Sequence, residues 1–254
     1  MISTFKAGLT RSYSLVLLLA AWEILSRAGV ANPQVLPAPS VVFAHLAQAL
    51  CDVQFIQHLA QTALRLASGL TIATVLGIGL GLAAATWPMG GRLLEPLMRL
   101  LAPIPKIALY PALILTLGFD HASKIALVAA DALFPVLFST YYGARLVERK
   151  LIWSARAAGT SPAGCALKVI LPAALPSVLT GFRVAVVISC VVVFLAEMIT
   201  STDGLGHLLI RAARSFKTLD MFVPLVTISL LGLGLDAAVG LARRRLLAGY
   251  PEQR

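Results

Sequence analysis

Six stretches of this 254-residue chain are long and apolar enough to cross a membrane as helices. A hydrocarbon core of about 30 Å requires about 20 mostly apolar helical residues. The stretches cover residues 14–31, 62–86, 98–118, 124–145, 176–199 and 222–242. The sequence therefore predicts an all-α integral membrane protein with six transmembrane helices.

The composition supports this class and argues against a nucleic-acid-binding protein. Hydrophobic residues make up 59% of the chain and charged residues only 13%, which is far from the composition of soluble domains. The net charge of +10 is spread between the apolar stretches, and aromatic residues make up only 7%. This pattern fits contact with lipid headgroups better than a nucleic-acid groove.

Cysteines and histidines are too scattered for a disulfide framework or a metal site. Cys51, Cys165 and Cys190 lie far apart, and no C-x-x-C pair occurs. The four histidines, at positions 45, 58, 121 and 207, are equally dispersed. We expect this chain to bind no metal and no cofactor of its own.

The distribution of lysine and arginine predicts the orientation. With a cytoplasmic N-terminus, inner connections hold 14 of these residues and outer connections hold 5, while Arg65 and Arg183 lie near or within spans. Because basic residues favour the cytoplasmic side, both termini are expected there. The first stretch contains Glu23 and precedes five more spans, so we interpret it as an uncleaved helix rather than a signal peptide.

Three regions follow from this arrangement. Residues 1–57 hold the first span and an outer connection, in which Ser40 could cap an amphipathic helix lying on the membrane surface. Residues 58–242 form the main transmembrane domain, and residues 243–254 form a basic cytoplasmic tail. In the second span, small residues recur every four positions, which indicates close helix packing; these are Gly69, Ala73, Gly77, Gly81 and Ala85.

The cytoplasmic connection 146–172 has the pattern of a helix–turn–helix. A helix continuing from the fourth span is expected to stop at Gly159, which can adopt a positive φ. Ser161 and Pro162 are expected to start the next helix, and Pro172 and Pro176 to break the chain again before the fifth span.

This connection cannot act as a nucleotide-binding loop. Gly159 and Gly164 have the spacing of the glycines of a P-loop, but Cys165 and Ala166 stand where Lys and Ser or Thr would be needed. The chain is therefore predicted not to be an enzyme and not to bind ATP there.

The same connection resembles the cytoplasmic signature E-A-A-x-x-x-G-(x)n-I-x-L-P of binding-protein-dependent ABC importer permeases of type I. The matching residues are Ala155, Gly159, Ile170, Leu171 and Pro172. The stretches "LPAALPSVLTGFR", "PIPKIALYPALILTLGF", "LAEMI" and "GLGHLL" are similar to the nitrate/sulfonate/taurine-type branch. Trp153 and Ser154 replace the Glu and the first Ala of the signature.

The resemblance implies the function and the partners. The chain would be the permease subunit of an ATP-driven importer in a bacterial inner membrane, with the transmembrane type-1 domain of that family over residues 58–242. Two copies would assemble with two ATP-binding subunits, which carry the ATP and Mg, and with an extracytoplasmic solute-binding protein. The cargo would be a small anion such as a sulfonate, taurine or nitrate; a thiamine precursor or another aromatic solute is the alternative.

The resemblance also implies which residues couple the permease to the ATPase. The connection would rest in a groove of the ATPase, where Trp153 could add apolar contact area. The candidate coupling residues are Trp153, Ala155, Arg156, Gly159, Leu171 and Pro172. A secondary transporter is a further alternative, but the chain shows no internal repeat that would support it.

Charged residues inside predicted spans are candidate pathway or gate residues. Charge within a membrane is costly, so Asp131, Arg183, Glu197 and Asp236 either serve transport or form structural pairs. Structural pairing is the alternative for Asp131, Arg183 and Asp236. Glu197 lies in "LAEMI" at the outer end of the fifth span, which suggests an outer gate or a subunit contact.

Overall fold

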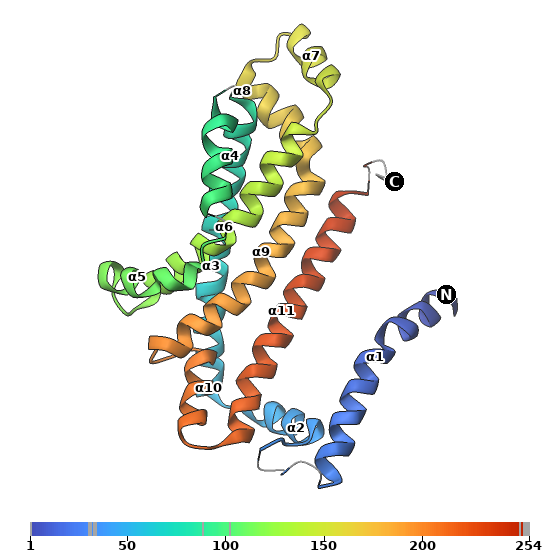
Figure 1. The fold of residues 1–254 in the computed structure, drawn as a ribbon. Coiled ribbons are helices and arrows are strands. Elements are labelled where there is room, and N and C mark those ends of the chain that lie inside the picture. The colour runs from blue at the N-terminus through green and yellow to red at the C-terminus, as the bar shows by residue number, and fades with distance from the viewer. Residues whose placement is uncertain are drawn as a thin grey trace.

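The computed structural model describes residues 2–29, 32, 35–87, 89–101, 103–248 and 250. Within these residues the chain consists of helices and turns without any strand, which confirms the all-α prediction (Figure 1). The helices are α1 (Ile2–Arg27), α2 (Pro39–Ala49), α3 (Val53–Thr86), α4 (Gly90–Leu101), η1 (Lys106–Leu109), α5 (Tyr110–Leu117), α6 (His121–Arg145), α7 (Arg149–Ala157), α8 (Pro162–Cys165), η2 (Ala166–Ile170), α9 (Leu171–Thr200), α10 (Leu205–Arg214) and α11 (Thr218–Leu246).

Four helices of the described chain are long and apolar enough to cross a membrane. They are α3, α6, the continuous helix Pro162–Thr200 and α11. These helices contain the spans predicted at 62–86, 124–145, 176–199 and 222–242. A bent pair of shorter helices raises the number of candidate spans to five.

The span predicted at 98–118 is a bent pair of helices rather than one continuous helix, and whether the pair crosses the membrane stays a prediction. Its first residues belong to α4, and the rest belong to η1 and α5; the two segments meet at an angle of 86°. Pro103 and Pro105 lie at the bend. Proline has no N–H and restricts the preceding residue, so two prolines two positions apart end the helix.

The first predicted span, 14–31, coincides only partly with α1. This helix ends at Arg27, followed by Gly29 with a φ of 72°, and residues 30 and 31 lie outside the described residues. Arg27 forms an ion pair with Glu23 at 2.5 Å. Because α1 is not among the four helices that are long and apolar enough, the sixth span stays a prediction.

The helix predicted after the first span is present as α2, but Ser40 does not cap it. The N-cap is Ala38, and Pro39 occupies the first turn. The Ser40 hydroxyl instead donates to a carboxylate oxygen of Glu23 at 2.6 Å. A hydrogen bond to an ionised carboxylate is stronger than one to a neutral backbone group. The bond between Ser40 and Glu23 therefore joins α2 to α1.

Small residues let the central helices approach closely. α6 packs along both α3 and α9. A Cβ on Gly77 would lie 2.9 Å from the Cβ of Val136, and a Cβ on Gly181 would lie 2.5 Å from the carbonyl oxygen of Pro135. The predicted packing role of the small residues in the second span is thereby confirmed at its glycines.

Two expected features of the chain around α7 and α9 are wrong. The helix of the fourth span does not continue into the connection, because α6 ends at Arg145 and α7 begins only at Arg149. Pro172 and Pro176 do not interrupt the fifth span. Pro172 lies in the first turn of α9, directly after the π-helical turn η2. The change of hydrogen-bond register caused by this proline is accommodated in the π-helical turn. The helix therefore continues from Pro162 to Thr200.

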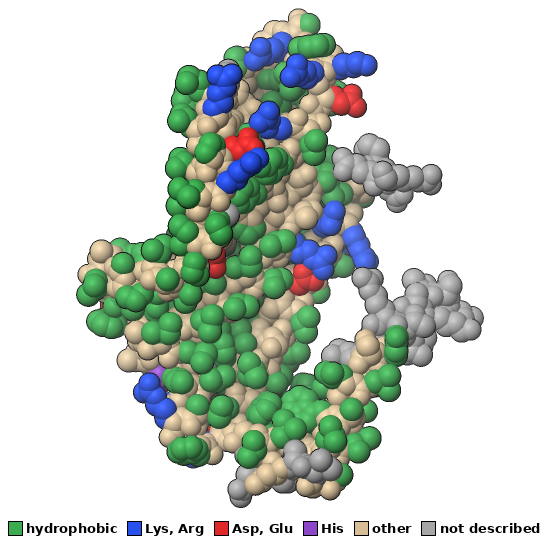
Figure 2. All heavy atoms as spheres, in the orientation of Figure 1, with side chains coloured by type: hydrophobic (Ala, Val, Ile, Leu, Met, Phe, Trp, Pro, Cys, Tyr) green, Lys and Arg blue, Asp and Glu red, His purple; other side chains and the backbone are tan. Residues whose placement is uncertain are grey.

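Short helices lie at both ends of the bundle. α7 and α8 lie at one end of the bundle, and α10 and α2 lie at the other (Figure 1). Lysine and arginine side chains gather over the α7 end, whereas hydrophobic side chains cover the middle of the bundle (Figure 2). This distribution is typical of a membrane protein whose middle faces lipid.

Candidate coupling site

The turn after α7 has the predicted left-handed geometry. Gly159 has a φ of 80°. Its N–H donates to the carbonyl of Arg156, and the N–H of Thr160 donates to the carbonyl of Ala155, both at 3.0 Å. This pair of bonds is a Schellman motif, in which the residue after the C-cap takes a positive φ. The predicted helix stop at Gly159 is confirmed.

The next helix begins as the sequence indicated. The Ser161 hydroxyl accepts a hydrogen bond from the N–H of Gly164 at 3.1 Å, and Pro162 occupies the first helical turn. Proline fits this position because its missing N–H has no partner there. The segment α7–turn–α8, residues 149–165, is called the coupling hairpin below.

A small apolar cluster joins the coupling hairpin to the bundle. Ile152 is the residue of α7 that packs against this cluster, and the thiol of Cys165 lies 4.0 Å from the carbonyl oxygen of Ile152. The buried members of the cluster are Leu82, Ala144, Ala166, Ile170 and Ala174. The other face of α7 is open, and 63% of Trp153 is exposed. The hairpin is therefore held on one face and free to contact a partner on the other.

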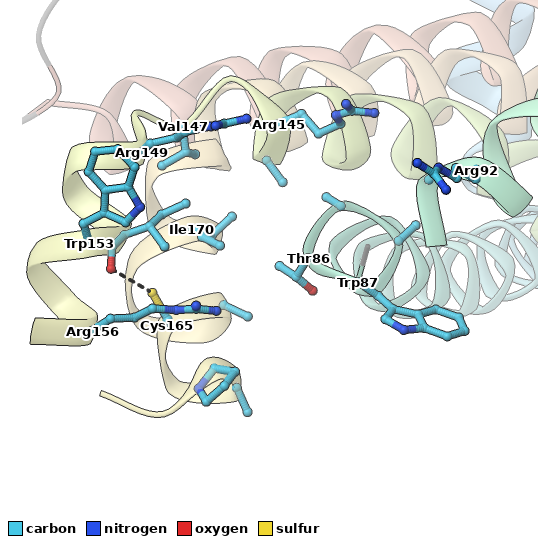
Figure 3. A pocket seen from close by; sticks show the side chains of 18 of the residues that line it. Thr86, Trp87, Arg92, Arg145, Val147, Arg149, Trp153, Arg156, Cys165 and Ile170 are labelled. Atoms are coloured by element: carbon cyan, nitrogen blue, oxygen red, sulfur yellow. Dashed lines mark hydrogen bonds between the residues drawn. The ribbon is translucent and has the colours of Figure 1, made fainter. Parts of the chain in front are cut away.

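A cavity of about 820 Å³ separates the coupling hairpin from the junction of α3 and α4. Trp153 and Arg156 lie on its hairpin side, and Trp87 and Arg92 lie opposite (Figure 3). Among the described residues that line the cavity, four are arginines, at positions 92, 145, 149 and 156, and one, Glu95, carries a carboxylate. The positive excess fits an acidic partner surface.

The remaining candidates of the coupling loop lie close to the hairpin but do not line this cavity. Ala155 and Gly159 form the turn. Leu171 packs against the apolar cluster, and the carbonyl of Pro172 accepts a hydrogen bond from the Tyr250 hydroxyl at 2.8 Å. The structure therefore groups Trp153 with Arg156 at the cavity and places Leu171 and Pro172 in the support beneath.

Three of the four candidate intramembrane charges form structural pairs. Arg183 of α9 binds both carboxylate oxygens of Asp236 on α11, at 2.5 and 2.7 Å. Asp131 lies 3.8 Å from the amine of Lys106, which also sits over the ring of Phe134. The geometry supports the structural alternative for Arg183, Asp131 and Asp236.

Glu197 lies at the centre of a buried polar network rather than on an exposed gate surface. Its side chain is completely buried within this chain, and the predicted gate or subunit-contact role stays a prediction. Its carboxylate accepts hydrogen bonds from Arg65 at 2.7 Å, from Thr62 at 2.9 Å and from the N–H of Gly206 at 3.1 Å. Buried charge is tolerated when it is paired and hydrogen-bonded in this way.

Arg65 is the residue that the sequence analysis missed. It is 2% exposed, and it contacts Asp203 and His121 as well as Glu197. An arginine inside an otherwise apolar helix could have indicated a buried ion pair, but the sequence does not show which residues pair with it. We call Arg65, Glu197, Asp203 and Thr62 the outer network.

Asp203 lies in the turn between α9 and α10, outside the membrane-spanning helices. Partial burial raises the pKa of this carboxyl, but the hydrogen bond and charge of Arg65 have the larger combined effect and hold the pKa below its usual value. This carboxylate pairs with Arg65 and thereby anchors the turn.

Comparisons with known proteins agree with this architecture. The family described as binding-protein-dependent transport system inner membrane component matches residues 53–248. The chain is 32% identical over 230 residues to the permease protein SsuC of Bacillus subtilis (strain 168), which is named for aliphatic sulfonates, covering 91% of this chain and 83% of SsuC. It is 30% identical over 244 residues to the taurine transport system permease protein TauC of Escherichia coli (strain K12), covering 94% and 89%.

Solved structures share the fold. A chain of the MetNI methionine ABC transporter in an inward-facing conformation matches with a TM-score of 0.67 at 18% identity, over 76% of this chain and 96% of that one. A chain of a bacterial alginate ABC transporter, solved with a periplasmic protein bound to an alginate pentasaccharide, matches with a TM-score of 0.62 at 13% identity, over 95% and 96%.

Proposed function

This chain belongs to the family of binding-protein-dependent transport system inner membrane components, and we propose that its coupling hairpin carries the contact with the ATPase subunit of the importer. It is a multi-pass membrane protein and the permease subunit of an ATP-driven ABC importer. The observation that carries the proposal is the hairpin itself. It has a fixed turn, an exposed Trp153 and a positively charged cavity behind it.

Charge reversal at the cavity tests this contact. Arg156→Glu places a carboxylate where an acidic partner surface is expected, so less ATPase should co-purify with the permease. Lys168→Glu is the matched control, because Lys168 is exposed near the hairpin but does not line the cavity. Equal co-purification of ATPase with both variants and the wild type would refute the proposal.

The partners follow from the importer mechanism. Two copies of this chain surround a pathway, two ATP-binding subunits hold ATP and Mg, and a solute-binding protein delivers cargo from outside. Closure of the ATPase pair shifts the permease between inward and outward access. The purified permease without its partners should show only background ATP hydrolysis.

The cargo is a small sulfonate such as taurine. Support comes from the relatives SsuC and TauC, which are named for aliphatic sulfonates and for taurine. Uptake of labelled taurine and of a short alkanesulfonate by cells with and without this permease is the test. Uptake of a labelled thiamine precursor instead of either sulfonate would favour the alternative cargo.

The orientation places both termini and the coupling hairpin in the cytoplasm. Support comes from the asymmetry of basic residues and from their concentration at the α7 end (Figure 2). A single cysteine at position 215, between α10 and α11, should react with an impermeant reagent from outside. Reaction only from the cytoplasmic side would reverse the topology.

A further inference from the structure

A groove runs between α9 and α11 on the outer surface of the bundle. The two helices pack along each other (Figure 1), and a cavity of about 760 Å³ lies between them. Its α9 side is a stripe of exposed residues at four-residue spacing, which places them on one face of the helix. These residues are Arg183, Val187, Val191 and Leu195. We call this cavity the α9–α11 groove.

The groove is apolar over most of its length and charged at one end. Among the described residues that line it, the charged ones are Arg183 and Asp236. They pair with each other, so they lie at the same end, while Leu195 and Leu225 line the other end of the two helices. An apolar slot with a few polar groups at a fixed place is typical of a small-molecule site.

The charged end lies deep in the membrane. Arg183 and Asp236 are each about 6–7 Å along the helix from the middle of their predicted spans, 176–199 and 222–242. The Arg183 side chain is 50% exposed and that of Asp236 is 27% exposed. A charge at this depth faces protein or a water-filled cavity rather than lipid. The groove is therefore expected to open to the translocation pathway.

Arg183 has donors left for a second oxyanion. Its Nε and Nη2 each donate to one carboxylate oxygen of Asp236. A guanidinium carries five N–H donors, so these two bonds use only part of its capacity. The pair with Asp236 fixes the plane of the guanidinium, and its exposed edge can bind a further oxyanion in that plane.

We propose that the α9–α11 groove is a sulfonate site in the translocation pathway. The exposed edge of Arg183 binds the sulfonate oxygens while its pair with Asp236 stays in place, and the alkyl part of the cargo lies along Val187 and Val191. The inference rests on the proposed function, in which two copies surround a pathway and the cargo is a sulfonate. It adds that the permease itself, and not the solute-binding protein alone, selects for an aliphatic sulfonate.

A thiol at position 187 tests whether the groove holds water and attracts anions. Val187→Cys lies one helical turn from Arg183, and the permease–ATPase complex is held in nanodiscs without nucleotide. Two methanethiosulfonate reagents are compared, one carrying an ethylsulfonate and the other an ethyltrimethylammonium. Labelling of residue 187 is followed by peptide mass spectrometry and corrected for the rate of each reagent with a free thiol.

The sulfonate reagent should label position 187 about tenfold faster than the cationic one, because a cleft with a cation concentrates anions. Adding Arg183→Gln to the same chain should abolish this preference. An excess of taurine should slow the labelling. Equal rates for the two reagents, or a preference that survives Arg183→Gln, would overturn the inference.

Val75→Cys is the matched control for access. Val75 is 66% exposed near the middle of the predicted span 62–86, but it does not line the groove. We expect lipid to cover it, so neither charged reagent should label it. If both reagents also fail at position 187, lipid or a second copy fills the groove, and the inference is wrong. Equal labelling at positions 75 and 187 would overturn it as well.

Uptake gives a second measurement that a defect in folding would not produce. The cargoes are taurine and the longest linear alkanesulfonate that cells with the wild-type permease import. Val191→Trp narrows the groove and should lower uptake of the longer cargo about tenfold but uptake of taurine only about twofold. Val191→Leu should stay within about twofold for both. Because all strains carry the same binding protein, its own specificity cancels. Equal losses of both cargoes in Val191→Trp would overturn the site.

The wild type distinguishes this inference from the proposed function. If the wild-type importer, reconstituted with its ATPase and a taurine-loaded binding protein, takes up no taurine with ATP, the proposed cargo itself is refuted. If the wild type imports taurine but position 187 does not discriminate between the two reagents, only the site in the groove is wrong.

Discussion

α7 and α10 lie at opposite ends of the bundle, and both end in a Schellman motif with the same pair of hydrogen bonds. Gly159 occupies the left-handed position after α7, whereas Phe216 occupies it after α10. A Cβ on Gly159 would meet nothing within 4 Å, so the glycine there is required by φ and not by space. The same left-handed backbone conformation is therefore unstrained at Gly159 and strained at Phe216.

The two ends are also fastened to the bundle by different forces. An apolar cluster with Ile152 holds the coupling hairpin. The buried ion pair of Arg65 with Glu197 holds the base of α10. An apolar contact tolerates small shifts, but a buried ion pair depends on geometry, because an unpaired charge is costly. The α10 end is therefore the more rigid one, and the α7 end can follow a moving partner.

The largest effect is expected from breaking the outer network. Arg65→Met leaves Glu197 buried without its cation, so the free energy of unfolding should fall by about 3–5 kcal/mol. Thermal unfolding of the purified permease measures it. The control is Arg183→Met, because the pair of Arg183 with Asp236 is partly exposed and should contribute about 1 kcal/mol or less. Equal losses in both variants would show that burial does not distinguish the two pairs.

The next effect is expected at the left-handed glycine. Gly159→Val introduces about 1–2 kcal/mol or more of backbone strain, because a β-branched residue disfavours a φ of 80°. The bundle should still insert and express, whereas co-purification of the ATPase and uptake of cargo should fall. Gly159→Ala should be milder. Wild-type assembly and uptake in Gly159→Val would mean that the turn is not the coupling element.

A smaller effect is expected from the cap of α8. Ser161→Ala removes the side-chain bond to Gly164 and should cost about 1 kcal/mol locally, so ATPase co-purification should fall less than in Gly159→Val. Ser154→Ala is the control, because Ser154 is exposed on α7. If Ser161→Ala reduced co-purification of the ATPase as much as Gly159→Val does, the cap of α8 rather than the positive φ of Gly159 would determine the conformation of the coupling hairpin.

The smallest effect has the opposite sign. Phe216→Gly relieves the strain at a φ of 55°, although glycine also gains freedom in the unfolded chain. The net result should be an increase of about 0.5–1 kcal/mol in the free energy of unfolding, measured by thermal unfolding. A destabilised Phe216→Gly would indicate that the ring supports the fold, and the contrast with Gly159 would then disappear.

Much of the coupling hairpin could be predicted because its signals are local. Gly159, Ser161 and Pro162 each favour one backbone conformation through their own chemistry, and the structure confirms the turn and the cap. The break between α6 and α7 was not predicted, because no proline or glycine marks residues 146–148. The prolines at 103 and 105 did carry a signal, but the apolar composition of 98–118 outweighed it in our interpretation.

The sequence by itself determined the membrane class, the family resemblance, most of the long helices and the left-handed turn at Gly159, because hydrophobic length and glycine or proline chemistry act over a few residues. Only the tertiary structure decided that Arg65 meets Glu197, that Arg183 meets Asp236, and that Phe216 takes a positive φ. Charge pairing across helices depends on which faces pack together, and a strained phenylalanine looks like any other apolar residue in a sequence. Pairing and strain are properties of the packed chain, which no local pattern specifies.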